Sequence, residues 1–299
     1  MSKIARGLTL AEILPPAQAA GYAVPAFSTR YLACIRMAVL AAIETRSPVI
    51  IEISQRELNW FGLTPKDYRE TLDRVLTETK ADVPFALHLD HTTNLDLIRA
   101  AIEAGFTSVM IDASAKPFRE NIEITREVVE IAHAAGVSAE AELGKLTDTH
   151  KMETDSDEEM YTDPNEAGEF VRATRCDALA VSIGTAHGNY PVKSPKIDFA
   201  RLEKIRAAVG ATPIVLHGGS GLPPETVHRA MAMPGGGVSK MNIATDLEDG
   251  LREAMGGTPR MTSAELDAQP PELVAKGLEA VKRVAKEKIT EFVRSAGRA

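Results

Sequence analysis

Short apolar runs recur along the whole chain, and amphipathic segments separate them. Near-continuous apolar strands that alternate with helices are typical of a parallel sheet covered on both faces. The eight expected strands are Ala23–Phe27, Pro48–Ile53, Pro84–Leu89, Ser108–Ile111, Ser138–Ala141, Ala178–Ser182, Pro213–Leu216 and Val238–Met241.

The segments between the strands carry helix signals. Leu95–Ala104 has apolar residues at helical spacing and is followed by Gly105, a common C-terminal stop. Thr64 and Asp163 each precede a proline, which predicts a capped helix start. A further short helix should begin after Thr9, ahead of the first strand, where it could close the bottom of a barrel.

Eight strand–helix units within 299 residues fit a closed (β/α)₈ TIM barrel better than an open, doubly wound sheet. No GxGxxG follows the first strand, which disfavours dinucleotide binding. We therefore expect one α/β domain over residues 1–299. Two parts fall outside the repeat: a long polar loop at about 145–161, expected at the active site, and a C-terminal helix at about 272–296.

Composition narrows the classes of partner. The net charge is −8 and no basic run is present, which disfavours nucleic acid as a partner. No apolar stretch is long enough for a membrane span, and the first residues lack a signal peptide's apolar core. Cys34 and Cys176 stand alone, as expected for reduced thiols. We expect a cytoplasmic protein.

Polar residues gather where the strands end, which is the face of a barrel that carries active sites. Three of the seven histidines fall there, and carboxylates and an amide accompany them. The strand-end residues are Asp90, His91, Asp112, Glu140, Glu142, His187, His217 and Asn242.

Such a concentration of charge needs compensation by a cation or a substrate. Three imidazoles with an open fourth position form a catalytic Zn²⁺ site in many enzymes. His91, His187 and His217 are therefore the expected metal ligands. His88 shares the face of Asp90 and is either a supporting residue or part of the core.

A glycine-rich turn, His217-Gly-Gly-Ser-Gly221, precedes a helix. Such a turn can present backbone N–H groups to an anion, and barrels often bind phosphate after strands seven and eight. We interpret this turn and residues 242–246 as a phosphate site.

The motifs in this order resemble the class II fructose-bisphosphate and tagatose-bisphosphate aldolases. They are HLDH (88–91), AGFTSVMIDAS (104–114), EAELG (140–144), IGTAHG (183–188), LHGGSG (216–221) and KMNIATD (240–246). The similarity extends over essentially the whole chain.

The resemblance implies roles for individual residues. Asp90 would carry the proton, the three histidines would bind zinc, and Asp112 and Glu142 would form an alternate or second metal position. The ketose phosphate would bind Gly188, Gly218, Gly219, Ser220, Asn242, Ala244 and Thr245. Gly188 and Gly218 also fall where the family holds Na⁺ or K⁺. Family members are usually homodimers or homotetramers.

The implied reaction is reversible cleavage of a ketose bisphosphate, first of all fructose 1,6-bisphosphate, in carbohydrate metabolism and glycolysis. The products would be dihydroxyacetone phosphate and glyceraldehyde 3-phosphate. A lysine Schiff base is the metal-free route to the same reaction, and Lys240 lies late in the eighth strand. The ordered histidines favour the metal route.

The long loop departs from the family pattern. Many members carry GG-x-E-D there, with a glutamate that helps exchange a proton of dihydroxyacetone phosphate, whereas this chain lacks the paired glycines. Glu153, Glu158 and Glu159 are the alternatives for that carboxylate.

Three further alternatives remain open at this stage. They are an aldolase for tagatose bisphosphate or another ketose phosphate, a zinc hydrolase on the same fold, and a non-catalytic descendant of the family. Arg298, near the chain end, could reach a neighbouring subunit's site.

Overall fold

The computed structural model describes residues 6–144, 161–185 and 197–299. Eight parallel strands close into a barrel in which each strand pairs with its neighbours in sequence and β8 pairs with β1. The strands are β1 (Val24–Ser28), β2 (Val49–Ser54), β3 (Phe85–Thr92), β4 (Ser108–Ile111), β5 (Ser138–Leu143), β6 (Ala178–Val181), β7 (Ile214–Leu216) and β8 (Val238–Ile243). The predicted (β/α)₈ barrel is confirmed, and each expected strand overlaps an observed one.

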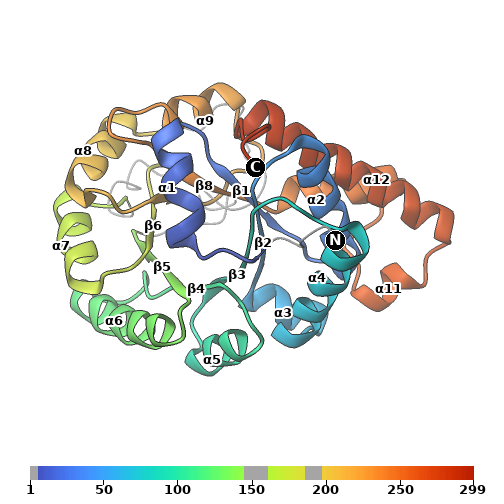
Figure 1. Cartoon of the computed structure of the whole chain (residues 1–299), viewed down its shortest axis with the longest axis horizontal. Helices are drawn as coiled ribbons and strands as arrows, with labels where there is room; N and C mark the ends of the chain where they lie inside the picture. Colours follow the sequence, from blue (N-terminus) through green and yellow to red (C-terminus); the bar gives the residue numbers. More distant parts are fainter. Residues whose placement is uncertain (1–5, 145–160, 186–196) are drawn as a thin grey trace.

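Helices surround the barrel (Figure 1). They are α1 (Leu10–Ala20), α2 (Leu32–Thr45), α3 (Gln55–Phe61), α4 (Pro65–Thr79), α5 (Leu95–Glu103), α6 (Phe118–Ala134), α7 (Pro164–Thr174), α8 (Phe199–Val209), α9 (Pro224–Met231), α10 (Thr245–Ala254), α11 (Ser263–Asp267) and α12 (Pro271–Glu287). A π-helical turn, η3 (Lys288–Phe292), follows α12. No helix among the described residues is long and apolar enough to span a membrane.

Helix starts follow local capping chemistry. The side chain of Thr64 accepts from the amide of Asp67 at the start of α4, and Asp163 accepts from the amides of Asn165 and Glu166 at the start of α7. Each cap satisfies backbone donors that the first helical turn would otherwise leave unpaired. These contacts fix where the barrel helices begin.

Helix α1 lies across one end of the barrel (Figure 1) and buries its apolar side against the barrel interior. Leu10, Leu14 and Ala17 join a cluster of inward-pointing strand residues that includes Val24 and Ile50. The bottom of the barrel is therefore an apolar plug, and the interior becomes polar toward the other end.

Side chains alternate between the two faces of each strand, so every second residue points inward. Four strands place a charged residue or histidine two positions before a polar residue of the mouth: Glu52 before Ser54, His88 before Asp90, Glu140 before Glu142 and Lys240 before Asn242. All four deeper side chains are fully buried. We call Glu52, His88, Glu140 and Lys240 the middle tier.

Strand β3 contains a bulge that explains how two adjacent residues reach the same site. Its register with β4 shifts between Leu89 and Thr92, and His91 within that interval has a positive φ of 30°. The bulge turns His91 toward the interior beside Asp90, although strict alternation would point it away. The expected strand ended too early, at Leu89, because its polar continuation resembles a turn.

The chain ends at the bottom of the barrel. The amide of Gly297 donates to the carbonyl of Thr45, the last residue of α2, and the guanidinium of Arg298 stacks over Tyr22, which precedes β1. Arg298 therefore lies at the opposite end of the barrel from the strand-end residues.

Candidate functional site

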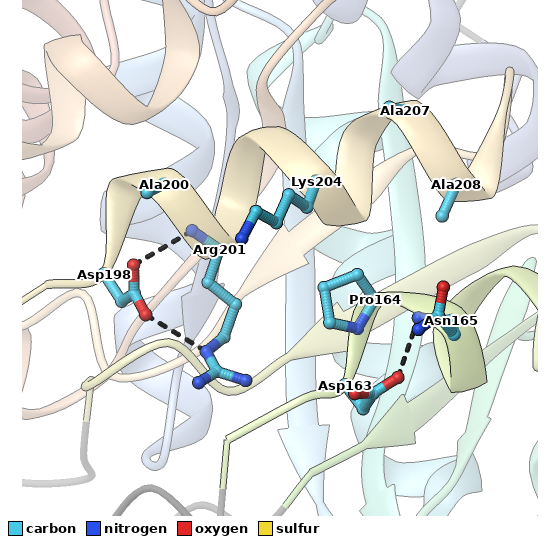
Figure 2. A pocket seen from close by; sticks show the side chains of 9 residues that line it. All are labelled: Asp163, Pro164, Asn165, Asp198, Ala200, Arg201, Lys204, Ala207 and Ala208. Atoms are coloured by element: carbon cyan, nitrogen blue, oxygen red, sulfur yellow. Dashed lines mark hydrogen bonds and ion pairs between the residues drawn. The ribbon is translucent and has the colours of Figure 1, made fainter.

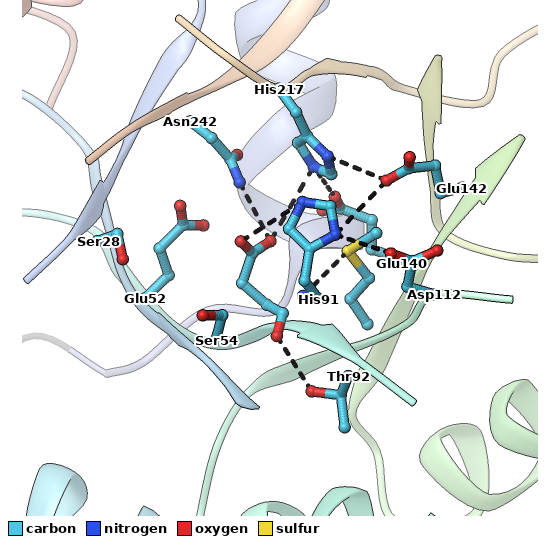
Figure 3. A network of polar contacts seen from close by, with 12 residues as sticks. Ser28, Glu52, Ser54, His91, Thr92, Asp112, Glu140, Glu142, His217 and Asn242 are labelled. Atoms are coloured by element: carbon cyan, nitrogen blue, oxygen red, sulfur yellow. Dashed lines mark hydrogen bonds and ion pairs between the residues drawn. The ribbon is translucent and has the colours of Figure 1, made fainter. Parts of the chain in front are cut away.

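The predicted strand-end residues that the structure describes converge at the barrel mouth (Figure 3). Asp90 and His91 come from β3, Glu142 from β5, and Asp112 directly follows β4. His217 follows β7, and its ring packs edge-on against that of His91 with 4.4 Å between ring centroids. Donor atoms of Asp90, His91 and His217 lie within 4.8 Å of one another, close enough to share one metal ion.

Carboxylates surround the two imidazoles. Nδ1 of His91 donates to Asp112 at 3.1 Å, and the carboxylate of Glu142 lies 3.6 Å from the same nitrogen. Glu142 accepts from Nδ1 of His217 at 3.2 Å, while Nε2 of His217 donates to Glu140 at 2.9 Å. His91, Asp112 and Glu142 also form a second group with donor atoms within 4.8 Å.

The ionisable groups of the mouth shift one another's pKa values strongly. Burial disfavours a charged imidazole, but the carboxylates outweigh it and raise the pKa of His91 to about 9 and that of His217 to about 10. Burial alone would raise the pKa of the Asp90 carboxyl, yet the His91 imidazole, His88 and Lys240 hold it well below its usual range.

The donor set fits a divalent metal. Two imidazoles, with the carboxylates of Asp112 and Glu142 in reach, are the ligands that zinc prefers, and the carboxylates can orient ligating rings. The third expected ligand, His187, and the adjacent Gly188 lie outside the described residues, as do Glu153, Glu158 and Glu159.

The expected phosphate site lies between the turn after β7 and the start of α10. Gly218 adopts a positive φ of 71°, and a Cβ on Gly219 would lie only 2.7 Å from the carbonyl oxygen of Asn242. The hydroxyl of Ser220 accepts from the amide of Asp246 in the first turn of α10. The turn is therefore held against the N-terminus of a ten-residue helix, which favours anions.

The residues of that turn and of the start of α10 differ in the groups that they could present to a phosphate. Thr245 opens α10 and Ala244 is its N-cap residue. The amide of Gly219 already donates to the carbonyl of Asn242, and the amide of Gly221 donates to the Asp246 carboxylate. These two amides stabilise the turn instead of pointing toward a ligand.

The contacts within the middle tier are the part of the site that the sequence did not predict. Glu140 contacts His217, and the ammonium of Lys240 lies 2.9 Å from Glu140 and 3.3 Å from Glu52. The available signal was the two-residue spacing that places each middle-tier side chain below a residue of the mouth. Glu140, Lys240 and His88 were considered from the sequence, and Glu52 was not. His88 is buried and hydrogen-bonded to Ser108.

Histidines elsewhere have local partners. His133, at the end of α6, pairs with Asp177 at 2.9 Å, and His228 is hydrogen-bonded to the carbonyl of Glu291. Both contacts are structural, and neither residue approaches the mouth.

A separate cavity of about 680 Å³ lies on the outer wall between α7 and α8 (Figure 2). Three of its charged groups are engaged locally: Asp163 caps α7, while Asp198 caps α8 and pairs with Arg201 at 3.1 Å. We therefore place the functional site at the barrel mouth.

Comparison with known proteins shows which family this chain resembles. The family model described as "Fructose-bisphosphate aldolase class-II" matches residues 8–298. A fructose-bisphosphate aldolase from Geobacillus stearothermophilus is 38% identical over 289 residues, which is 95% of this chain and 96% of that protein.

Two solved structures are similar over nearly their whole length. The YdjI aldolase from Escherichia coli K12 superimposes with a TM-score of 0.81 at 33% identity, covering 98% of this chain and 100% of the other. A putative fructose-1,6-bisphosphate aldolase from Coccidioides immitis gives a TM-score of 0.80 at 27% identity, with 96% of each chain covered.

Proposed function

This chain belongs to the class II fructose-bisphosphate aldolase family and is a carbon–carbon lyase, and we propose that it cleaves a ketose bisphosphate with the help of a divalent metal ion. The observation that carries the proposal is the convergence of Asp90, His91 and His217, with donor atoms within 4.8 Å of one another, at the barrel mouth. The preferred metal is Zn²⁺, because imidazole is a ligand that suits it.

His91, His187 and His217 would hold the catalytic zinc ion, one per subunit. Asp112 and Glu142 would form a second or alternate metal position, supported by their 3.1 Å and 3.6 Å distances to Nδ1 of His91. When bound, the metal would act as a Lewis acid that stabilises the negative charge developing beside the substrate's carbonyl.

Asp90 would take the proton of the C4 hydroxyl during cleavage and return it during condensation. Its carboxylate is mostly buried, with 8% of the side chain exposed, and Asn242 donates to its Oδ1 at 3.1 Å. Oδ2 faces His91, 4.0 Å from Nε2. Oδ1, which also lies 4.0 Å from Nε2 of His217, is therefore held by the hydrogen bond from Asn242, while Oδ2 faces His91.

The phosphate of the ketose would bind between the turn after β7 and the start of α10. Ser220 and Thr245 supply hydroxyl groups there, and the α10 N-terminus favours negative charge. The other proposed contacts are Gly188, Gly218, Gly219, Asn242 and Ala244. The amide of Gly219 is already hydrogen-bonded to Asn242, so this glycine would contribute only the space that its missing side chain leaves for the phosphate. A Na⁺ or K⁺ ion beside Gly188 and Gly218 would complete this end of the site.

Fructose 1,6-bisphosphate is the proposed substrate, giving dihydroxyacetone phosphate and glyceraldehyde 3-phosphate. The name of the Geobacillus relative supports it, and tagatose 1,6-bisphosphate, which differs only at C4, is the second candidate. From the family we also propose a cytoplasmic homodimer or homotetramer.

A coupled assay against ketose mono- and bisphosphates tests the substrate. We expect zinc-loaded enzyme to cleave fructose 1,6-bisphosphate with the highest kcat/KM. A higher kcat/KM for tagatose 1,6-bisphosphate would move the assignment to that sugar. Cleavage of none of the sugars by protein with one zinc per chain would contradict the proposed function.

Asp90→Ala tests the proton carrier separately from the metal site. We expect this variant to keep its zinc, measured by elemental analysis, and to lose at least about a hundredfold in kcat, as for other positioned acids and bases. Loss of the metal together with activity would make Asp90 a ligand or a structural residue.

A further inference from the structure

Lys240 is a fully buried lysine inside the barrel, one step below Asn242 on β8. Its ammonium lies 2.9 Å from Glu140, 3.3 Å from Glu52 and 3.8 Å from Oδ1 of Asp90. It is therefore surrounded by carboxylates that come from three other strands.

Burying so many charges is costly, because each group loses its hydration. Burial opposes a charged ammonium, but the carboxylates of Glu140, Glu52 and Asp90 outweigh it and raise the pKa of Lys240 above its usual value. The ammonium thus stays protonated at neutral pH. A protonated amine cannot attack a carbonyl, so Lys240 does not fit the Schiff-base role considered from the sequence.

Lys240 also bears on a possible cation site. Donor atoms of Glu52, His88 and Asp90 lie close enough together to hold a metal. The ammonium of Lys240 already contacts the carboxylates of Glu52 and Asp90, so this group has a built-in cation. A second positive ion would be repelled there, which leaves the mouth as the place for the metal.

The contacts of Asp90 divide between its two oxygens. Oδ1 accepts from Asn242 at 3.1 Å and lies 3.6 Å from Nε2 of His88 and 3.8 Å from the Lys240 ammonium. Oδ2 lies on the side of His91. Oδ1 also lies 4.0 Å from Nε2 of His217, so it is held between the mouth and the middle-tier residues His88 and Lys240, while Oδ2 faces His91.

We propose that Lys240 is a positioning residue for the aldol reaction, whose fixed ammonium, bridging Glu140 and Asp90, orients Asp90 so that Oδ2 meets the substrate hydroxyl. This inference rests on the proposed function. Glu140 extends the same support to His217, because its two oxygens contact Lys240 and His217 at 2.9 Å each.

Lys240→Met removes the ammonium and keeps much of the side chain's volume. We expect the variant to retain zinc and to lose about tenfold or more in kcat for cleavage, with KM within about twofold, because misplacing a reacting group lowers turnover more than binding. Exchange of the C3 proton of dihydroxyacetone phosphate with D₂O should fall much less, since that molecule has no C4 hydroxyl for Asp90 to serve.

The exchange reaction separates positioning from general damage. A variant whose metal site is disturbed should lose cleavage and exchange together, and that outcome would overturn the proposal. Wild-type turnover in Lys240→Met would overturn it as well. The proposed function is tested independently, by cleavage in the wild-type enzyme.

Two further variants protect the test against misfolding. Burial and the nearby Asp90 carboxylate raise the pKa of Glu52 to about 8, so this side chain is largely protonated at neutral pH. The double variant Lys240→Met with Glu52→Gln fixes that neutral state once the ammonium is gone, and it should show the same selective loss of cleavage. Leu202→Ala in α8 removes a fully buried apolar side chain from the outer layer. It should lower the melting temperature and leave kcat unchanged. If Leu202→Ala showed the same selective loss of cleavage, the loss in Lys240→Met would be explained by lower stability, and the proposal would be overturned.

Discussion

The ion-pair network beside the barrel mouth yields a quantitative prediction for Arg30→Met. Arg30 is 8% exposed, and its guanidinium donates to Glu57 at 2.7 Å and to Glu248. Glu248 also accepts two hydrogen bonds from Arg260, each 2.6 Å long. The network ties the segment after β1 to α3 and α10.

The two carboxylates differ in what they would lose. Removal of one partner of a buried ion pair typically costs about 3–5 kcal/mol, because the other charge stays buried without compensation. Glu248 would keep Arg260, so most of the cost would come from Glu57, which retains a hydrogen bond from Ser28. We therefore expect the lower end of the range, about 3 kcal/mol of unfolding free energy.

Urea unfolding at pH 7 measures this loss, and a double-mutant cycle with Glu57→Gln assigns it. Once Glu57 is neutral, Arg30→Met should cost less, with a coupling energy of about 1–3 kcal/mol between the two changes. A loss below about 1 kcal/mol for Arg30→Met, or single effects that simply add, would refute the reasoning.

Two other predictions follow from close packing and from the buried carboxylates. Gly219→Ala should lower the unfolding free energy by about 1–3 kcal/mol and should also lower kcat. The reason is that the new Cβ would lie 2.7 Å from the Asn242 carbonyl oxygen and 2.8 Å from Met241 Sδ. Unchanged urea unfolding and turnover would contradict this prediction. The pKa values of Glu57 and Glu248 lie below their usual 4.5, since arginine contacts outweigh the effect of burial. The stabilisation that these two carboxylates provide is complete above about pH 4.5 and is lost as the pH falls through their lowered pKa values. The melting temperature should therefore drop as the pH is lowered below about 4.5. A melting temperature that stays level or rises in that range would contradict this prediction.

The fold was predictable because its signal is repeated eight times. Near-continuous apolar strands such as Pro48–Ile53, alternating with capped helices, leave few arrangements other than a parallel barrel. The end of β3 was predicted less well, since Asp90, His91 and Thr92 resemble a turn. The strand continues because a bulge restores pairing between Thr92 and Ile111 of β4.

The mouth was more predictable than the middle tier for a physical reason. Polar residues at strand ends meet on one face whatever the details of the barrel, so His91 and His217 could be placed together from their positions alone. The roles of Glu52 and Lys240 depend on closure of the barrel, which brings β2 and β8 to either side of β1. A charged residue within a buried strand must have a partner of opposite charge, but the sequence does not say which residue that partner is. Only the tertiary structure identifies it.

The central claim, an aldolase that depends on a metal held at the barrel mouth, is tested most directly by removing and restoring the metal. The enzyme is treated with a chelator, the residual metal is measured, and cleavage of fructose 1,6-bisphosphate is followed as Zn²⁺ is added back. We predict that cleavage disappears with the metal and returns in proportion to Zn²⁺, reaching its maximum near one ion per chain, and that Co²⁺ also restores it. Full cleavage activity in protein from which the metal has been removed would contradict the account.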